Sequence, residues 1–187
     1  MSDQPPVEAP DPGSQRAESL VLVATGDGKG KSTAAFGTML RAVAREWPVA
    51  VVQFLKSGDW QVGEEKIARQ LGVEWWAIGD GFTWDADSLD ESAAVAGEAW
   101  AAASALIAGG DHRLIILDEI TYAMNWGWID PTAVIRALED RPAHVSVMLT
   151  GRDASDALID AADTVTEMRK VKHAFDAGVR AKRGIDY

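Results

Sequence analysis

One stretch of this 187-residue sequence decides the fold: Thr25-Gly26-Asp27-Gly28-Lys29-Gly30-Lys31-Ser32-Thr33. It follows a short apolar segment, residues 20–24, and opens a segment with helical character, residues 31–46. Glycines permit positive φ, so consecutive backbone N–H groups can converge on an anion at the start of a helix. Lys31 would place a point charge beside phosphate oxygens, and the Ser32 hydroxyl suits Mg²⁺. The stretch therefore predicts a phosphate-binding loop.

The loop departs from the usual P-loop pattern at its first position. That pattern requires glycine where Thr25 stands, and Gly26 comes one residue late. The alternative is a glycine-rich turn with incidental lysines. A second motif favours the phosphate loop, because the apolar segment 114–117 ends in Asp118 and Glu119. This is the Walker B form, in which a carboxylate holds Mg²⁺ beside the phosphate loop; the alternative is a strand ending in solvated acids.

Short apolar segments alternate with helix-like segments from residue 19 to the end of the chain. Alternation with short connections predicts a parallel sheet covered on both sides. We therefore expect an α/β, three-layer P-loop fold with a mostly parallel sheet of about six strands, in a single domain over residues 19–187. The proline-rich, acidic residues 1–18 are predicted to be a disordered tail. The expected strands, each buried on both faces, are 20–24, 49–54, 73–78, 114–117, 145–150 and 164–168; the expected helices are 31–46, 64–71, 90–108, 131–139 and 154–162.

Composition excludes several functions. Lys and Arg total 18 against 29 Asp and Glu, a net charge of −11, which argues against nucleic-acid binding. Cysteine is absent, so thiolate catalysis, Cys-ligated zinc and iron–sulfur clusters are excluded. No apolar run approaches the ~20 residues of a membrane span, and a cytoplasmic location without membrane contact is expected. Eight tryptophans against four phenylalanines and two tyrosines are unusual.

Further motifs follow the expected strands in order. With the phosphate loop, they resemble the P-loop-type ATP:cob(I)alamin (corrinoid) adenosyltransferases, and the likeness spans residues 21–187. The motifs are Gln53-Phe54-Leu55-Lys56, Gly81-Phe82-Thr83-Trp84, Leu117-Asp118-Glu119-Ile120-Thr121-Tyr122, Thr150-Gly151-Arg152, Lys172-His173-Ala174-Phe175-Asp176-Ala177-Gly178 and Gly184-Ile185-Asp186-Tyr187.

The resemblance implies an activity and its reactants. Members of this family transfer the 5′-deoxyadenosyl group of ATP to the cobalt(I) of a reduced corrinoid and release triphosphate. Their fold is RecA-like, with ATP held in the reverse direction, so that C5′ of the ribose faces the acceptor. The corrinoid would be cobalamin, cobinamide or cobyrinic acid a,c-diamide. A homodimer and a flavodoxin-like or flavin reductant are also implied.

The resemblance also assigns roles to residues of this chain. The loop from Thr25 to Thr33 would bind the triphosphate, and Lys31 would neutralise the charge that develops on the leaving group. Ser32 and Glu119 would ligate Mg²⁺, or Mn²⁺ in its place, with Asp118 close by. Arg152 resembles a family arginine near the phosphates. Asp27 stands where many members have Asn, which the sequence does not explain.

Phe82 and Trp84 match the aromatic pair that members of this family place at the lower face of the corrin. Alternate residues of an extended segment point to one side, so both rings can address one surface. Large apolar rings there would exclude a lower ligand from cobalt and ease its reduction to cobalt(I). The alternative for Phe82 and Trp84 is an ordinary core position.

Other residues leave alternatives open. His173 and Asp176 could pair on one helical turn. Trp126 and Trp128 would pack at a subunit interface or at the corrin rim. Competing functions are a P-loop ATPase or small-molecule kinase that releases ADP, and a corrinoid carrier that escorts the product. The basic C-terminal residues are either a solvated face or a docking site for the electron donor: Lys170, Lys172, Arg180, Lys182 and Arg183.

Overall fold

The computed structural model describes residues 16–55, 63–78 and 89–186. Two predictions lie outside these ranges. One is the aromatic pair Phe82 and Trp84, and the other is nearly all of the expected tail, residues 1–15.

A six-stranded sheet forms the middle layer, and every pairing in it is parallel. This confirms the predicted α/β class with a parallel sheet. The strands lie in the order β3-β2-β4-β5-β1-β6. Their bounds are β1 Val21–Thr25, β2 Val49–Gln53, β3 Glu74–Ala77, β4 Leu114–Asp118, β5 Ser146–Thr150 and β6 Thr164–Glu167.

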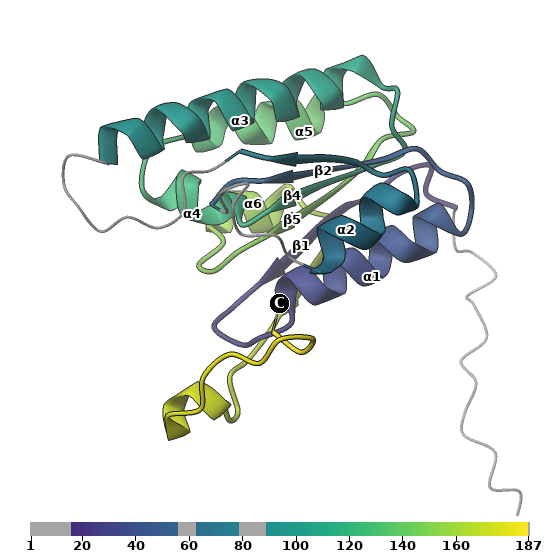
Figure 1. Cartoon of the computed structure of the whole chain (residues 1–187). Coiled ribbons are helices and arrows are strands. Elements are labelled where there is room, and N and C mark those ends of the chain that lie inside the picture. The colour runs from purple at the N-terminus through teal and green to yellow at the C-terminus, as the bar shows by residue number, and fades with distance from the viewer. Residues whose placement is uncertain (1–15, 56–62, 79–88, 187) are drawn as a thin grey trace, which may run out of the picture.

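Helices cover both faces of the sheet, as Figure 1 shows, with α1 and α2 on one side and α3 and α5 on the other. Such a three-layer arrangement follows from right-handed crossovers between parallel strands. The bounds are α1 Lys31–Val43, α2 Gly63–Gln70, α3 Leu89–Gly109, α4 Ile120–Asn125, α5 Pro131–Glu139 and α6 Asp156–Asp160, and a 3₁₀ turn covers Ala174–Ala177. Helix α5 begins as its sequence indicates, because the Asp130 side chain accepts a hydrogen bond from the Thr132 N–H and Pro131 follows at the first helical position.

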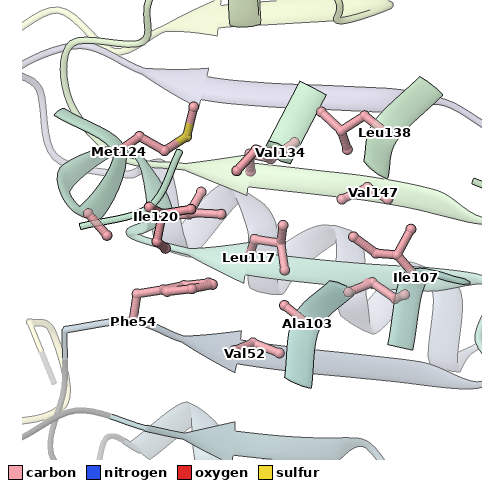
Figure 2. Close-up of a cluster of buried hydrophobic side chains, with 14 of the residues drawn as sticks. Val52, Phe54, Ala103, Ile107, Leu117, Ile120, Met124, Val134, Leu138 and Val147 are labelled. Carbon is pink, nitrogen blue, oxygen red and sulfur yellow. The ribbon is translucent and has the colours of Figure 1, made fainter. Parts of the chain in front are cut away.

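Two apolar cores form, one on each face of the sheet. Alternate residues of β2 go to opposite cores: Val49 and Val51 pack towards α1 and α2, and Ala50 and Val52 pack towards α3 and α5. Figure 2 shows the second core, where side chains from the strands meet those of the covering helices. Its labelled residues are Val52, Phe54, Ala103, Ile107, Leu117, Ile120, Met124, Val134, Leu138 and Val147.

The structure corrects several predicted details. Strands β2, β4 and β5 are buried throughout, whereas the edge strand β6 is exposed and β3 is partly exposed, because each has a neighbour on one side only. The helix expected over 154–162 is shorter, since the Ser155 side chain caps it and its last residue is Asp160. Helix α4 was not predicted, because its six residues are too few to show a helical period.

Helix α3 bears on the expected absence of a membrane span. In the part of the chain that the structure describes, one segment, Asp90–Gly109, is long and apolar enough to cross a bilayer by length and composition alone. The expectation that no such run exists is therefore wrong. The helix contributes Ala96, Ala99, Ala103 and Ile107 to the core on its face of the sheet, and 22% of the segment is buried.

Candidate functional site

The predicted phosphate loop connects β1 to α1 and contacts the chain at the end of β6. Its glycines are required by geometry: φ is 92° at Gly26 and 121° at Gly30. A Cβ added to Gly28 would lie 2.6 Å from the carbonyl oxygen of Met168. The loop is held in register there, since the Met168 N–H donates to the Thr25 carbonyl at 2.7 Å and the Gly28 N–H donates back to the Met168 carbonyl at 2.5 Å.

Lys31 spans the loop that precedes it. Its Nζ donates to the carbonyl oxygens of Gly26 and Gly28 at 2.7 and 2.8 Å. Burial lowers the pKa of Lys31 most, the Arg152 guanidinium lowers it further, and Glu119 is the first of three carboxylates that raise it. The ammonium therefore lies within electrostatic reach of both Arg152 and the carboxylates at the end of β4.

The carboxylates of the Walker B motif, at the end of β4, are positioned in part by strand β5. Strand β5 separates β1 from β4, and its last residue, Thr150, is buried. The Thr150 hydroxyl donates to Oδ1 of Asp118 at 2.7 Å, and Nε2 of Gln53 donates to Oδ2 at 2.9 Å. Asp118 is thus fully buried between two neutral donors.

Glu119 leaves the sheet in a left-handed conformation, with φ at 65°. A non-glycine residue in this region is strained by about 1–3 kcal/mol, and the surrounding contacts must compensate. One such contact is the Glu119 N–H, which donates to the Thr150 hydroxyl at 2.9 Å. The turn directs the chain into α4 and separates the environments of the two carboxylates.

Helix α4 holds the segment that carries Arg152. The Thr121 hydroxyl donates to the Arg152 carbonyl at 2.6 Å, and the Asn125 amide donates to the Asp153 carbonyl at 3.1 Å. Gly151 has φ 142°, and an added Cβ would lie 1.9 Å from the Thr121 hydroxyl. Arg152 reaches the loop, where its guanidinium lies 3.8 Å from the Asp27 carboxylate. This ion pair gives Asp27 a partner, which the sequence alone did not.

The C-terminal segment, residues 169–186, runs beside the phosphate loop; Figure 1 shows it in yellow below the purple β1–α1 connection. Lys29 forms an ion pair with Asp186, and Lys170 forms one with Asp176 at 3.1 Å. The loop and the segment enclose a cavity of about 330 Å³ between them. Its lining residues are Asp27, Gly28, Lys29, Lys31, Arg152, Lys170, His173, Phe175, Asp176 and Asp186.

The structure brings most of the predicted site together. Lys31, Arg152 and Asp27 meet at the loop, with Asp118 and Glu119 close enough to affect the pKa of Lys31. The other members of the predicted loop lie at the same turn, namely Thr25, Gly26, Gly28, Lys29, Gly30, Ser32 and Thr33.

Three supporting features were missed by sequence reasoning. Gln53 and Thr150 belong to motifs that the sequence showed, but their contacts with Asp118 were not predicted. The available signal was a polar residue at the end of a buried strand. The placement of residues 169–186 against the loop had no local signal. His173 does not form its expected contact with Asp176: its Nδ1 accepts from the Phe175 N–H at 3.1 Å, and Asp176 pairs with Lys170.

Comparisons with known proteins identify the family of this chain. Residues 17–187 match the family model described as ATP:corrinoid adenosyltransferase BtuR/CobO/CobP. A corrinoid adenosyltransferase of Escherichia coli K12 is 43% identical over 173 residues, which cover 92% of this chain and 88% of that protein. The corrinoid adenosyltransferase CobA of Salmonella typhimurium LT2 is equally similar, and a corrinoid adenosyltransferase of Pseudomonas aeruginosa PAO1 is 42% identical over 170 residues, which cover 90% of this chain and 83% of that protein. On this similarity and on the P-loop architecture, the chain belongs to the ATP:corrinoid adenosyltransferase family.

Proposed function

We propose that this chain transfers the 5′-deoxyadenosyl group of Mg-ATP to the cobalt(I) of a reduced corrinoid and releases inorganic triphosphate. The observation that carries the proposal is the convergence of Lys29, Lys31 and Arg152 on one cavity at the phosphate loop. A leaving triphosphate develops negative charge along its whole length, and preorganised cations favour that charge in the transition state. Membership of the adenosyltransferase family supports this chemistry over an ATPase or a kinase.

The reaction balances as a displacement at carbon. Cobalt(I) supplies the electron pair that forms the cobalt–C5′ bond, and the C5′–oxygen bond breaks with its pair going to triphosphate. Cobalt is thereby formally oxidised to cobalt(III). No proton transfer is needed at the reacting carbon, so the site needs cations and alignment more than a general base. Lys31, held across the loop by two carbonyl oxygens, is placed to follow the leaving group.

A magnesium ion fits the oxygen donors at this edge of the sheet. Among the described residues, no group of three or more His, Cys, Asp or Glu side chains is placed to hold a metal ion alone. A Mg²⁺ that arrives with ATP needs fewer protein ligands, because phosphates and water complete its octahedron. Ser32 and Glu119 would hold it, and Asp118, already bonded to Thr150 and Gln53, would orient the surrounding water. When bound, the metal neutralises phosphate charge.

Recognition of the corrinoid is assigned to aromatic side chains. Phe82 and Trp84 would cover the lower face of the ring and keep a lower ligand from cobalt. A second aromatic cluster stands at the end of α4, where the Trp126 and Trp128 ring centroids lie 4.7 Å apart and Tyr122 contacts Trp126 at 5.5 Å. This cluster adjoins the Arg152 segment through α4 and suits the corrin rim. A homodimer and a flavodoxin-like or flavin reductant complete the proposal.

The product identifies the reaction. The protein is incubated in the dark with ATP, Mg²⁺ and chemically reduced cobalamin or cobinamide, and the mixture is analysed for light-sensitive adenosylated corrinoid and for triphosphate. We expect the two in equal amounts. ADP without a cobalt–carbon product would instead support an ATPase or kinase, and one turnover with retained product would support a carrier. Lys31→Ala should abolish transfer, whereas Lys66→Ala, a matched lysine on the exposed side of α2, should not.

A further inference from the structure

The cavity at the phosphate loop has two walls, and only one of them belongs to the P-loop motif. The first wall consists of residues 27–29, Lys31 and Arg152. The second consists of Lys170, His173, Phe175, Asp176 and Asp186. The second wall comes from the C-terminal segment, more than a hundred residues away in sequence. If the P-loop motif alone bound the ligand, the lysine on this second wall would have no role in binding.

Three of the four cations that line the cavity are paired with carboxylates of the chain itself. Lys29 pairs with Asp186, Lys170 with Asp176, and Arg152 with Asp27. All three pairs are partly exposed to solvent, and such pairs contribute about 0–1 kcal/mol each. A polyphosphate carries more charge and more acceptor oxygens than a single carboxylate, so it competes favourably for the same cations.

His173 adds a further hydrogen-bond donor on the same wall. Its Nδ1 accepts a hydrogen bond from the Phe175 N–H at 3.1 Å, which leaves Nε2 as the ring nitrogen that can donate. The carboxylate of Asp176 forms its ion pair with Lys170. Nε2 of His173 can therefore donate a hydrogen bond to a phosphate oxygen in the cavity, and no ion pair between His173 and Asp176 has to break first.

We propose that Lys170, with His173 beside it, binds the triphosphate chain directly, and that the phosphates replace Asp176 and Asp186 on Lys170 and Lys29. The proposal rests on the proposed function for the identity of the ligand. Lys170 is thereby separated from the other basic C-terminal residues: it lines the cavity, whereas Lys172, two positions away, does not. The carboxylates keep the cations compensated until the ligand arrives, and their release would loosen the C-terminal segment after binding.

Calorimetric titration of the full chain with inorganic triphosphate, without corrinoid, tests the assignment of Lys170. Lys170→Met should weaken binding about tenfold, the loss of one charge-assisted contact. Lys172→Met removes the same charge from the same exposed segment and should change the dissociation constant less than twofold. Equal effects of the two variants would overturn the assignment, because they would show general charge attraction only.

The exchange of partners is tested by Asp176→Asn. If phosphate displaces this carboxylate, the variant should bind triphosphate more tightly than the wild type. If Asp176 instead holds Lys170 in place in the complex, the variant binds more weakly, and the exchange is refuted. All these residues are exposed at the surface, so the variants should fold, and a thermal melt verifies it.

These outcomes are independent of the adenosyl transfer itself. A wild-type protein that forms no adenosylated corrinoid would refute the proposed function whatever its affinity for triphosphate. A wild-type protein that forms the product while Lys170→Met binds triphosphate normally would refute only the present inference.

Discussion

At the scale of single residues, the candidate site holds charged groups in unfavourable surroundings. Lys31 is half-buried beside the Arg152 guanidinium, and both effects lower its pKa. Its ammonium donates hydrogen bonds to two carbonyl oxygens of the loop. A bound triphosphate would add negative charge next to Lys31 and favour the protonated form.

The first prediction follows from the sign of that change. Triphosphate binding should raise the pKa of Lys31, so binding takes up protons at pH values between the lowered pKa of the ligand-free protein and the higher pKa of the complex. Below that window Lys31 is protonated in both states and contributes no uptake. Calorimetry in buffers of different ionisation heat, at about pH 9 where the phosphates themselves are fully ionised, measures the uptake.

The control is Lys31→Arg, which keeps the charge but does not titrate in this range. This variant should lose the proton uptake that increases with pH. Unchanged uptake in Lys31→Arg would show that another group is its source.

At the scale of elements, short segments that carry little local signal determine the positions of the candidate site residues. Helix α4 is six residues long, yet its Thr121 and Asn125 hold the backbone that carries Arg152. Strand β5 was expected from its apolar run, but its insertion between β1 and β4 was not. Because neighbouring strands are chosen by long-range packing, Thr150 became a partner of Asp118 only in the folded sheet.

The second prediction concerns the contact between Gly151 and Thr121. Gly151→Ala should lower the free energy of unfolding by about 2–4 kcal/mol, because the new Cβ meets the Thr121 hydroxyl and the residue is confined to positive φ. Triphosphate binding should weaken as well, since Arg152 follows directly. Denaturant unfolding and calorimetry measure the two effects.

Gly127→Ala serves as the matched control. Gly127 also has positive φ, at 73°, but an added Cβ would have no atom within 4 Å. It should lose only about 1–2 kcal/mol, the conformational cost. Thr121→Ala combined with Gly151→Ala should recover part of the larger loss, and equal losses in the two glycine variants would contradict the proposed clash.

At the scale of the whole molecule, the central strands lie within the buried apolar core. The candidate site lies where the strands end, at their carboxyl termini. Strands β2, β4 and β5 contribute buried residues to both cores, while β6 is exposed, and Met168, the residue after β6, is hydrogen-bonded to Thr25 and Gly28 of the phosphate loop. The sheet edge can therefore hold strained and charged groups because the interior supplies the free energy of folding.

The third prediction compares two valines of the same sheet. Val147 in β5 is completely buried, and Val165 in the edge strand β6 is 36% exposed. Val147→Ala should lower the free energy of unfolding by about 2 kcal/mol, from lost apolar burial and a residual cavity, and should lower Tm by about 4–8 °C. Val165→Ala should cost less than about 1 kcal/mol. Both losses are measured by denaturant unfolding. Comparable losses would contradict the view that the central strands contribute more to the free energy of unfolding than the edge strand β6 does.

The sequence by itself determined the elements whose chemistry is local. Glycine spacing, the lysine at the helix start and the apolar runs were enough to predict the loop between β1 and α1, the parallel sheet and the two carboxylates at the end of β4, because backbone conformation and strand burial depend on neighbouring residues. Phe82 and Trp84 stay predictions, since they lie outside the described residues.

The tertiary structure alone decided which distant groups meet at the loop. Asp27 forms an ion pair with Arg152, and Asp118 accepts hydrogen bonds from Gln53 and Thr150. Lys170, near the C-terminus, lines the same cavity as Lys31. These contacts join residues that lie from 32 to more than a hundred positions apart in the sequence. Such pairings arise from the order of strands in the sheet, which reflects the packing of the entire chain and leaves no periodic mark on any one segment.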